Sequence, residues 1–465
     1  MSESAAGLDL FAVVDIGKTN AKLVVADARD GRVVWSDEHR NRIVPGPPFQ
    51  QLDVAAIESW LVEAMERAPE KHRIGAIVPV GHGCGAVPLD VMGRTLPACD
   101  YEEAAVESIK AEYDAERDPF AATLTPDLPL GLNLGRQIYY IEAKHPELYR
   151  RIAVILPYPQ YWAWVLAGVM ASEVTSLGAH SGLWNPRDGK FSALAQRRRW
   201  HLLFPTLRKA GDVLGKLRPE IADRTGFPQG CKVLCGIHDS NCSYLNHMLA
   251  RPADSDFSVV STGTWIIVMA SGVDSTRLDP TRDMLGNVDP SGKVVATMRQ
   301  MGGREYALLA GENAAKPDAA TLARVVERGA MALPNFTQGG GPFMGRTGEL
   351  VNADGLDAVE KAALASVYLA LMTDVMLELL GTKGEVIVEG SFSLNSVFAP
   401  ILAMLRPDQR ISVSDDRAGT VGGARLLALG ATKSEARTTA VSGLAGIDLA
   451  RYREKWLEAV GHWPK

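Results

Sequence analysis

One strand–turn–strand pattern occurs twice in this chain, close to the start and again just past the middle. Residues 11–26 place Val13 and Val14 before a turn built on Gly17, after which the apolar pattern resumes. Residues 257–270, FSVVSTGTWIIVMA, repeat two valines, a polar residue, a spacer, a glycine and a polar residue. β-Branched residues around a glycine-containing turn predict a β-hairpin at each place. We interpret the repetition as an internal duplication, with two unrelated hairpins as the alternative.

The length of the chain favours two domains. A chain of 465 residues exceeds what a single hydrophobic core usually serves. Helical and strand patterns alternate along it, which is typical of an α/β protein. Helices are predicted over 51–67, 137–149, 158–168, 356–380 and 398–405, and strands over 75–79 and 385–388. We expect the boundary within 243–256, which gives domains 1–245 and 246–465.

Both turns have residues suited to phosphate. Backbone N–H groups converge in such a turn, glycine permits close approach, and threonine adds a hydroxyl donor. Asp15 in the first turn would repel a phosphate. We therefore predict that it acts through Mg²⁺, which prefers oxygen ligands. An ordinary hairpin turn is the alternative for the first turn by itself. No Gly-x-x-x-x-Gly-Lys-Ser/Thr loop and no suitably placed Gly-x-Gly-x-x-Gly occur, which disfavours P-loop and Rossmann sites.

Asp239 is the candidate catalytic base. It follows a short apolar run, 231–236, and stands between the two phosphate-type turns. Phosphoryl transfer needs a group that positions the attacking hydroxyl and accepts its proton, and a carboxylate beside His238 can do this. A helix N-cap is the alternative, because an aspartate before a Ser-Asn-Cys-Ser run also satisfies free backbone N–H groups.

Two glycine-containing segments follow near the C-terminus. The strand ending at Glu389-Gly390-Ser391 leads to Asn395, which could bind adenine or ribose or could simply cap the next helix. Residues 418–424, AGTVGGA, are interpreted as small-residue packing at the start of a core helix, for which no function is needed.

Composition excludes several classes of protein. A net charge of -6 is not that of a nucleic-acid-binding domain. Five scattered cysteines fit a reducing cytoplasm, and Cys231 and Cys235 are predicted to be buried thiols rather than metal ligands. The first residues lack the cationic start of a signal peptide, and the apolar stretch 158–171 is too short to span a membrane.

In their order and spacing these motifs resemble the FGGY family of carbohydrate kinases, which belongs to the actin-like ATPase superfamily. DIGKTNAK resembles the first phosphate motif, with Asp15, Gly17, Thr19 and Lys22 in register. GIHDS resembles the catalytic motif and STGTW the second phosphate motif. Residues 388–405 and 419–428 resemble the adenosine region and the closing helix, and 157–192 the lid region. The resemblance covers nearly the whole chain.

The resemblance implies an α/β fold with two ribonuclease-H-like (actin-like ATPase) domains around a central cleft. Residues 1–245 would bind the sugar and carry lid insertions, and 246–465 would bind the nucleotide. It implies ATP and Mg²⁺ as cofactors, Asp239 as the catalytic residue, and Asp15 with Asp239 at the metal. The cofactor-binding residues it implies are Asp15, Gly17, Lys18, Thr19, Asn20, Lys22, Thr262, Gly263, Thr264, Gly302, Gly390 and Asn395. The substrate-binding residues are His82, Gly83, Asp100, Tyr101, Glu103, Gln160, His238 and Asp239.

The chain departs from the family pattern mainly around the sugar. The Gly-Gln-Met-His-Gly segment is Gly-His-Gly-Cys-Gly at 81–85, and Trp-x-Asp-x-Arg is replaced by the segment 100–103. Gln160 stands where an aspartate is common, and Glu389-Gly390 stands where the adenosine motif has two glycines. The length of the chain and its lid region resemble the branches of the family that act on ketoses. This resemblance favours a five- or six-carbon ketose of the rhamnulose, fuculose, ribulose or xylulose type as the substrate.

Other functions stay open at this point. A non-catalytic, nucleotide-dependent binding or regulatory protein on the same fold is one alternative, and a polyol kinase is another. A glucokinase-like protein is disfavoured, because its cysteine-rich zinc segment is missing. We expect a cytoplasmic protein with a small-molecule sugar as partner, no nucleic acid and no membrane, and we hypothesise a homodimer.

Overall fold

The computed structural model describes residues 7–311, 313–337, 340–414 and 419–461. Contacts divide the chain into two compact units. The first comprises the chain up to Ala250 with Gly286–Val294 and Gly419–Ser434, and the second comprises Arg251–Leu285, Val295–Ala418 and the chain from Glu435 onward. Residues 2–6, in which we looked for a signal peptide, and Ala418 of the AGTVGGA segment lie outside the described residues.

The first unit is built on a mixed sheet. Its strands are β1 (Leu10–Ile16), β2 (Asn20–Asp27), β3 (Val33–Arg40), β6 (Ile74–Gly81), β11 (Val213–Lys216) and β12 (Lys232–Leu234), in the order β11-β12-β6-β1-β2-β3. The strand β13 (Ile237–His238) also pairs with β6. β1 and β2 are antiparallel, while β1, β12 and β13 each run parallel to β6. The hairpin predicted over 11–26 is confirmed.

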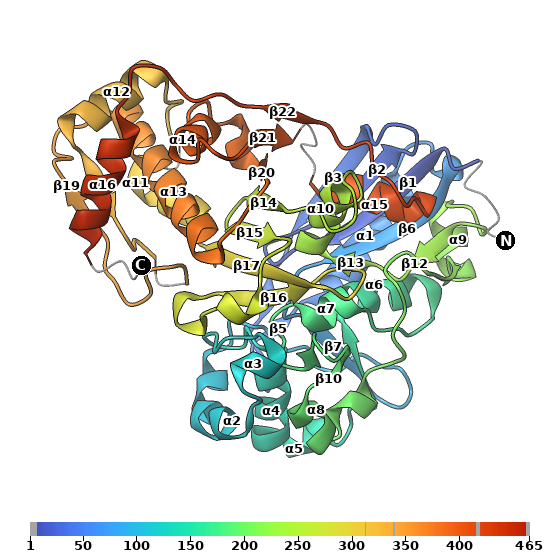
Figure 1. Cartoon of the computed structure of the whole chain (residues 1–465). Coiled ribbons are helices and arrows are strands. Elements are labelled where there is room, and N and C mark those ends of the chain that lie inside the picture. The colour runs from blue at the N-terminus through green and yellow to red at the C-terminus, as the bar shows by residue number, and fades with distance from the viewer. Residues whose placement is uncertain (1–6, 312, 338–339, 415–418, 462–465) are drawn as a thin grey trace. The chain divides into compact units, whose positions relative to one another are not determined.

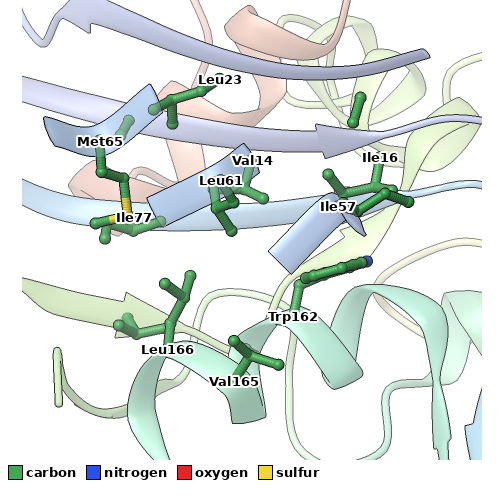
Figure 2. Packing of buried hydrophobic residues seen from close by; sticks show 14 of the residues in the cluster. Val14, Ile16, Leu23, Ile57, Leu61, Met65, Ile77, Trp162, Val165 and Leu166 are labelled. Atoms are coloured by element: carbon green, nitrogen blue, oxygen red, sulfur yellow. The ribbon is translucent and has the colours of Figure 1, made fainter. Parts of the chain in front are cut away.

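Both faces of this sheet are covered by helices because the side chains of β1 alternate between two apolar clusters. Val14 and Ile16 pack with Leu61 of α1 (Val54–Arg67) and Trp162 of α6 (Tyr158–Ala167), as Figure 2 shows. Phe11 and Val13 belong to the opposite cluster, together with side chains of α10 (Asp239–Met248) and α15 (Thr420–Leu429). The sheet therefore holds the ends of β1 and β13 between two buried layers.

The remaining helices of the first unit are shorter or belong to its insertions. They are α2 (Lys110–Glu116), α3 (Phe120–Thr123), α4 (Leu134–Lys144), α5 (Pro146–Tyr149), α7 (Val174–Gly178), α8 (Ala193–Arg197) and α9 (Pro219–Thr225). Its two-stranded pairs are β4 (Ile43–Val44) with β5 (Gln51–Leu52), β7 (Ala86–Leu89) with β8 (Val154–Pro157), and β9 (Trp184–Asn185) with β10 (Lys190–Phe191).

The second unit has a sheet of the same order as the first. The strands of this sheet are β14 (Phe257–Thr262), β15 (Ile266–Ala270), β16 (Leu285–Val288), β17 (Val294–Gln300), β20 (Glu385–Gly390), β21 (Ile411–Ser414) and β22 (Thr438–Ala440); of these, β16 consists mostly of residues that group with the first unit. They are arranged β16-β17-β15-β14-β20-β21-β22 (Figure 1). The run β17-β15-β14-β20-β21 repeats β3-β2-β1-β6-β12, with the hairpin and the parallel strand in the same places. The hairpin predicted over 257–270 is thus confirmed.

The described residues of the second unit form five α-helices, of which one is long. They are α11 (Gly302–Ala310), α12 (Ala319–Arg328), α13 (Ala358–Leu380), α14 (Phe398–Leu405) and α16 (Leu449–Val460), with the strand pair β18 (Met331–Leu333) and β19 (Glu349–Val351). By length and composition α13 could cross a membrane, and it is longer than the stretch 158–171 that we singled out. However, 89% of its most apolar window is buried inside the protein, as in the core helix of a soluble protein.

Most predicted elements are confirmed, with shifts at their ends that have local causes. The helix predicted from residue 51 begins at Val54, because Gln51 and Leu52 pair in β5 and Asp53 caps the helix through the N–H of Ala56. The helix predicted over 137–149 is two helices that break before Pro146, whose nitrogen has no proton to donate. The division at 245/246 stays a prediction, since contacts group Gly286–Val294 and Gly419–Ser434 with the first unit.

Candidate active site

Asp15 lies near the end of β1 and is one of two neighbouring carboxylates in the first unit. The hydroxyl of Thr420 donates to its Oδ2 at 3.0 Å, and Lys22 faces it across the β1–β2 pair. Burial raises the pKa of Asp15 to about 6, and the negative charge of Asp239 adds to the rise. An acid with a raised pKa beside a second carboxylate is typical of a functional site.

This pair fits a divalent cation. Mg²⁺ is commonly held by one or two carboxylates, with waters and substrate phosphates completing its shell. Asp15 and Asp239 supply two such carboxylates and repel each other in the absence of a cation. Across the described parts of the chain, no three His, Cys, Asp or Glu side chains group as metal ligands.

Asp239 is the first residue of α10, and its side chain is 34% exposed. Its Oδ1 accepts a bond from the N–H of Ser240 at 2.5 Å and from the Ser240 hydroxyl at 3.2 Å. Nε2 of His238 lies 3.2 Å from the same oxygen. His238 occupies the N-cap position, but Asp239 satisfies one free N–H in the first turn of α10, so it has part of the structural task that the N-cap alternative gave it.

The loop before Asp239 is held by a buried glutamine. Gln160 is fully buried, and its Nε2 lies 3.2 Å from the carbonyl oxygens of both Cys235 and Gly236. Gly236 has φ +85°, and a Cβ there would lie 2.4 Å from the carbonyl oxygen of Pro79. The amide nitrogen of Gln160 thus fixes the bend that leads to Asp239, while its Oε1 is buried without a hydrogen-bond partner in the described structure, and its predicted role in substrate binding stays a prediction.

A cluster of polar and aromatic side chains lies beside this loop. Lys18 pairs with Asp100, and its ammonium lies 4.5 Å from the ring centre of Tyr101. The ring of His82 lies 5.6 Å from that of Tyr101 and 4.6 Å from that of Tyr158. We call Lys18, His82, Asp100, Tyr101 and Tyr158 the polar cluster. Lys18 was predicted to bind the cofactor, but it lies with the predicted substrate residues.

Two atoms of the polar cluster are buried without a hydrogen-bond partner in the described structure, Nε2 of His82 and Oδ2 of Asp100. Nδ1 of His82 lies 2.7 Å from the carbonyl oxygen of Gly83 and therefore carries the ring proton, which leaves Nε2 as an acceptor. Burial lowers the pKa of His82 and favours the neutral ring. Both buried atoms are thus acceptors, which suits the hydroxyl donors of a sugar.

Gly83 brings the polar cluster close to the loop before Asp239, because a Cβ there would lie 3.0 Å from Nε2 of His238. His238 itself is buried, which lowers its pKa, although the charge of Asp239 opposes this shift. The structure therefore brings the predicted residues 82–83, 100–101 and 238–239 together in the first unit.

The first phosphate-type turn is tied by a residue that the sequence did not single out. The N–H of Gly17 bonds to the carbonyl of Asn20 at 2.9 Å. Asn41 donates through Nδ2 to the carbonyl of Gly17 at 2.8 Å and through its N–H to the carbonyl of Thr19. Lys22 is exposed, with its Nζ 3.7 Å from Glu38.

The second turn, in the second unit, leaves room for a ligand. Gly263 and Thr264 are exposed, and a Cβ on Gly263 would come no closer to another atom than 4.0 Å. Gly303 at the start of α11 packs beneath the turn, since its Cβ would lie 2.3 Å from the carbonyl oxygen of Gly263. Gly390 has φ +79°, and a Cβ there would lie 2.0 Å from the carbonyl oxygen of Thr262. The turn is therefore supported from within and open above Gly263, a form that fits a phosphate of ATP.

Some predicted residues have structural contacts instead. Glu103 caps a 3₁₀ turn through the N–H of Ala105 and also accepts from the N–H of Gln50. Asn395 accepts from the N–H groups of Val397 and Phe398 at the start of α14, which is the capping alternative. Thr262 donates to the carbonyl of Glu389 and accepts from the N–H of Phe392. Gly302 packs on Ile266. The ligand roles of these residues stay predictions.

Three other residues of the site were not predicted to be functional. Thr420 stood in a segment that we interpreted as packing and as part of the closing helix, Thr175 lay within the lid resemblance without a role of its own, and Asn241 matched no motif. Asn241 contacts His238, and the hydroxyl of Thr175 accepts from the N–H of His238 at 3.1 Å. Only a fold that joins 173–176, 238–241 and 420 could reveal these contacts.

Comparison with known proteins supports the fold and the order of the motifs. Residues 10–246 match the N-terminal domain of the FGGY family of carbohydrate kinases, and residues 254–438 match the carbohydrate kinase FGGY C-terminal domain. A carbohydrate kinase from Novosphingobium aromaticivorans is 37% identical, with a TM-score of 0.86 over 97% of this chain and 98% of that one.

Two curated relatives are more distant. L-fuculokinase of Salmonella typhi is 23% identical over 288 residues, and rhamnulokinase of Halalkalibacterium halodurans is 23% identical over 270 residues. The matches span only 58% and 55% of these relatives. Two α/β units with sheets of equal order confirm the predicted ribonuclease-H-like domains of the actin-like ATPase fold. The chain belongs to the FGGY family of carbohydrate kinases.

Proposed function

We propose that this protein is an ATP-dependent kinase that phosphorylates a hydroxyl of a five- or six-carbon ketose. The observation that carries the proposal is the pair Asp15 and Asp239 in the same unit as the polar cluster. A base, a metal-binding carboxylate and buried acceptors for hydroxyl groups are the parts that such a reaction requires from the protein.

Different residues would bind the sugar and take its proton. His82 and Asp100 would accept hydrogen bonds from sugar hydroxyls and so orient the sugar, with Lys18 holding the Asp100 carboxylate. Oδ2 of Asp239 would accept the proton of the attacking hydroxyl as its oxygen bonds to the γ-phosphorus and the bond from that phosphorus to ADP breaks.

Asp15 would hold Mg²⁺, which when bound offsets the charge of the phosphates. In the second unit, the N–H groups around Gly263 and Thr264 would bind phosphate oxygens, and the turn at Gly390 would face the adenosine. Support for these roles comes from the open space over Gly263 and from the family to which the chain belongs.

The ketose preference rests on two observations. The unpartnered buried atoms of the polar cluster are acceptors, and curated relatives of this chain are named L-fuculokinase and rhamnulokinase. The small-sugar partner, the cytoplasmic location and the homodimer remain predictions.

A coupled assay of ADP release tests the proposal. Full-length protein with ATP and Mg²⁺ is offered fuculose, rhamnulose, ribulose, xylulose, glycerol and gluconate, each with a no-sugar control. We expect at least one ketose to stimulate ADP release well above that control. If none does, while ATP still binds, the non-catalytic alternative replaces the kinase. Stimulation by glycerol alone would favour a polyol kinase.

A further inference from the structure

Arg299 is a buried cation beside the second phosphate-type turn. It lies on β17 directly opposite Ile267 of β15. Its Cζ lies over the ring of Trp265, 4.9 Å from the ring centre. The carbonyl of Trp265 in turn accepts the N–H of Gly263 at 2.8 Å, so Trp265 closes the turn. The guanidinium of Arg299 therefore rests on a residue of the turn itself.

The repeated hairpin places Arg299 on the same face of its sheet as Asp15 has in the first sheet. One row of paired residues runs across β1, β2 and β3 from Asp15 to Glu38. The corresponding row runs across β14, β15 and β17 from Ser261 to Arg299. Each row begins directly after the repeated pair of valines. Because side chains that face each other on neighbouring strands share one face of the sheet, Arg299 occupies the face that carries the metal-binding candidate in the first unit.

The guanidinium has donors to spare. An arginine carries five N–H donors and stays charged at any ordinary pH. The side chain of Arg299 is only 8% exposed, and its Nε has no hydrogen-bond partner in the described structure. The carboxylate of Asp283 lies 3.5 Å from Nε, beyond the roughly 2.7–2.9 Å of a charge-assisted hydrogen bond. A cation buried in this way calls for a further anionic partner.

A structural ion pair with Asp283 is the alternative explanation for Arg299, but Asp283 is engaged elsewhere. Its Oδ2 accepts the N–H of Gly341 at 3.0 Å, and a Cβ on Gly340 would lie 2.3 Å from the same oxygen. Burial raises the pKa of Asp283 above its usual value, although Arg299 opposes the shift. The ion pair is therefore weak, and Asp283 mainly anchors the glycines beside it.

We propose that Arg299 binds a phosphate oxygen of the nucleotide at the turn 261–265. A planar guanidinium can donate two parallel hydrogen bonds to a phosphate. The turn itself, STGTW, contains no charged residue, so Arg299 would add positive charge to the backbone N–H groups that face the ligand. The assignment rests on the proposed ATP-dependent function and adds to it a residue that lies outside the sequence motifs.

Isothermal titration of the full-length protein with ADP, ATP and adenosine, each with Mg²⁺, tests the proposal. In Arg299→Met we expect Kd for ADP and ATP to rise about 10-fold or more, as for the loss of hydrogen bonds to a charged group. Kd for adenosine, which has no phosphate, should stay within about threefold. A loss of the same size for all three ligands would indicate a distorted nucleotide site and would overturn the proposal.

Asp283→Asn separates phosphate binding from ion pairing. The variant removes the negative charge beside Arg299 but keeps an oxygen that can accept the N–H of Gly341. We expect a Kd for ADP equal to or below that of the unaltered protein, because Arg299 then meets the phosphate without a competing carboxylate. If Asp283→Asn instead weakens ADP binding as much as Arg299→Met does, Arg299 serves the ion pair and the proposal is wrong.

If the unpaired Asp283 prevents Arg299→Met from folding, the double variant Asp283→Asn/Arg299→Met takes its place, with the same expected loss of ADP and ATP binding. Arg324→Met is the matched control in the second unit, since Arg324 is exposed and its Nε lies 3.3 Å from Glu360. Its Kd for ADP should be unchanged.

The titration needs no sugar and no turnover, so it distinguishes this assignment from the kinase function. ADP binding that depends on Arg299, in a protein that phosphorylates no sugar, would contradict the kinase function and support the assignment. ADP binding that is indifferent to Arg299, in an active kinase, would overturn the assignment alone.

Discussion

Thr420 donates a hydrogen bond of 3.0 Å to Oδ2 of Asp15, although 405 positions separate the two residues in the chain. Thr420 begins α15, which packs on α10 in the first unit. The helices approach closely at Gly423, where a Cβ would lie 1.9 Å from the carbonyl oxygen of Cys242. A segment that follows nearly all of the second unit in sequence thus completes the surroundings of Asp15.

Removing this hydrogen bond should make activity more sensitive to acid. The Thr420 hydroxyl lowers the pKa of Asp15, which burial and Asp239 raise to about 6. In Thr420→Val the pKa of Asp15 should rise further, so Asp15 stays protonated to higher pH and binds Mg²⁺ more weakly near pH 6. We expect the acidic limb of kcat/KM to move to higher pH, with little change at pH 8. An unchanged pH profile would show that Thr420 has no influence on Asp15.

Asp15→Asn should impair use of the metal. The amide keeps the shape of the side chain but lacks its charge, so we expect a higher Mg²⁺ concentration for half-maximal activity. We also expect kcat to fall about 100-fold or more, in line with the loss of a charged group that acts in the transition state. A Mg²⁺ titration at saturating ATP and sugar measures both, and normal Mg²⁺ dependence would contradict the assignment.

Asp239→Asn should abolish turnover but leave the binding of ATP intact. General base catalysis contributes about 10²- to 10⁴-fold, so kcat should fall within or beyond that range. Isothermal titration of the variant with ATP should give a Kd near that of the unaltered protein. A variant with full activity would assign the proton transfer to another group.

Lys18→Met should affect the sugar rather than ATP. Lys18 pairs with Asp100 and lies over Tyr101, so its removal should raise KM for the sugar about 10-fold, the effect of roughly 1.4 kcal/mol, and leave KM for ATP nearly unchanged. Lys232→Met is the matched control in the same unit, since Lys232 is exposed on β12 and belongs to none of the predicted sites. A larger effect of Lys18→Met on ATP would restore its predicted role in cofactor binding.

Glu173 should make folding stability depend on pH. Burial raises its pKa from 4.5 to about 7, which corresponds to roughly 3 kcal/mol. Below pH 4.5 the group is protonated in both states and carries no cost. Between pH 4.5 and about 7 the unfolded chain ionises first, so this group lowers the free energy of unfolding as pH rises, and above pH 7 the cost is constant.

Glu173→Gln removes that titration. The free energy of unfolding of the variant relative to the unaltered protein should therefore increase between pH 5 and pH 8. Urea unfolding at the two pH values measures the change. A difference that is the same at both would show that Glu173 ionises normally in the folded protein.

Gly263→Ala and Gly303→Ala should separate ligand binding from packing. A Cβ on Gly263 would fill the open space above the turn, where we propose that a phosphate of ATP binds. We therefore expect an unchanged melting temperature and a higher KM for ATP. A Cβ on Gly303 would lie 2.3 Å from the carbonyl of Gly263, and such overpacking costs about 1–3 kcal/mol. Thermal melts and ATP titrations of both variants check this, and equal losses of stability would contradict it.

Local patterns in the sequence were enough for the two hairpins, for α6, α13 and α14, and for the position of Asp239 after a short strand. Their signals are periodicity and turn chemistry, which act over a few residues. The break before Pro146 and the start of α1 at Val54 were missed, because a cap and a short strand pair settle them.

The tasks of individual side chains depended on contacts between distant segments. Lys18 follows Gly17 in the first turn, yet it pairs with Asp100; Gln160 stands at a motif position for substrate, yet it holds Cys235 and Gly236. A long side chain can reach partners on several neighbouring segments, and its sequence position does not say which one it will meet.

The sequence by itself determined the fold class, the repeated hairpins and the residue types of the site, since each depends on short-range pattern and on motif order. Only the tertiary structure decided that Thr420 reaches Asp15, that Asn241 and Thr175 contact His238, and that Lys18 joins the polar cluster. The physical reason is that a hydrogen bond or ion pair depends on distance in space, and packing of α10 and α15 on one sheet sets that distance for residues far apart in the chain.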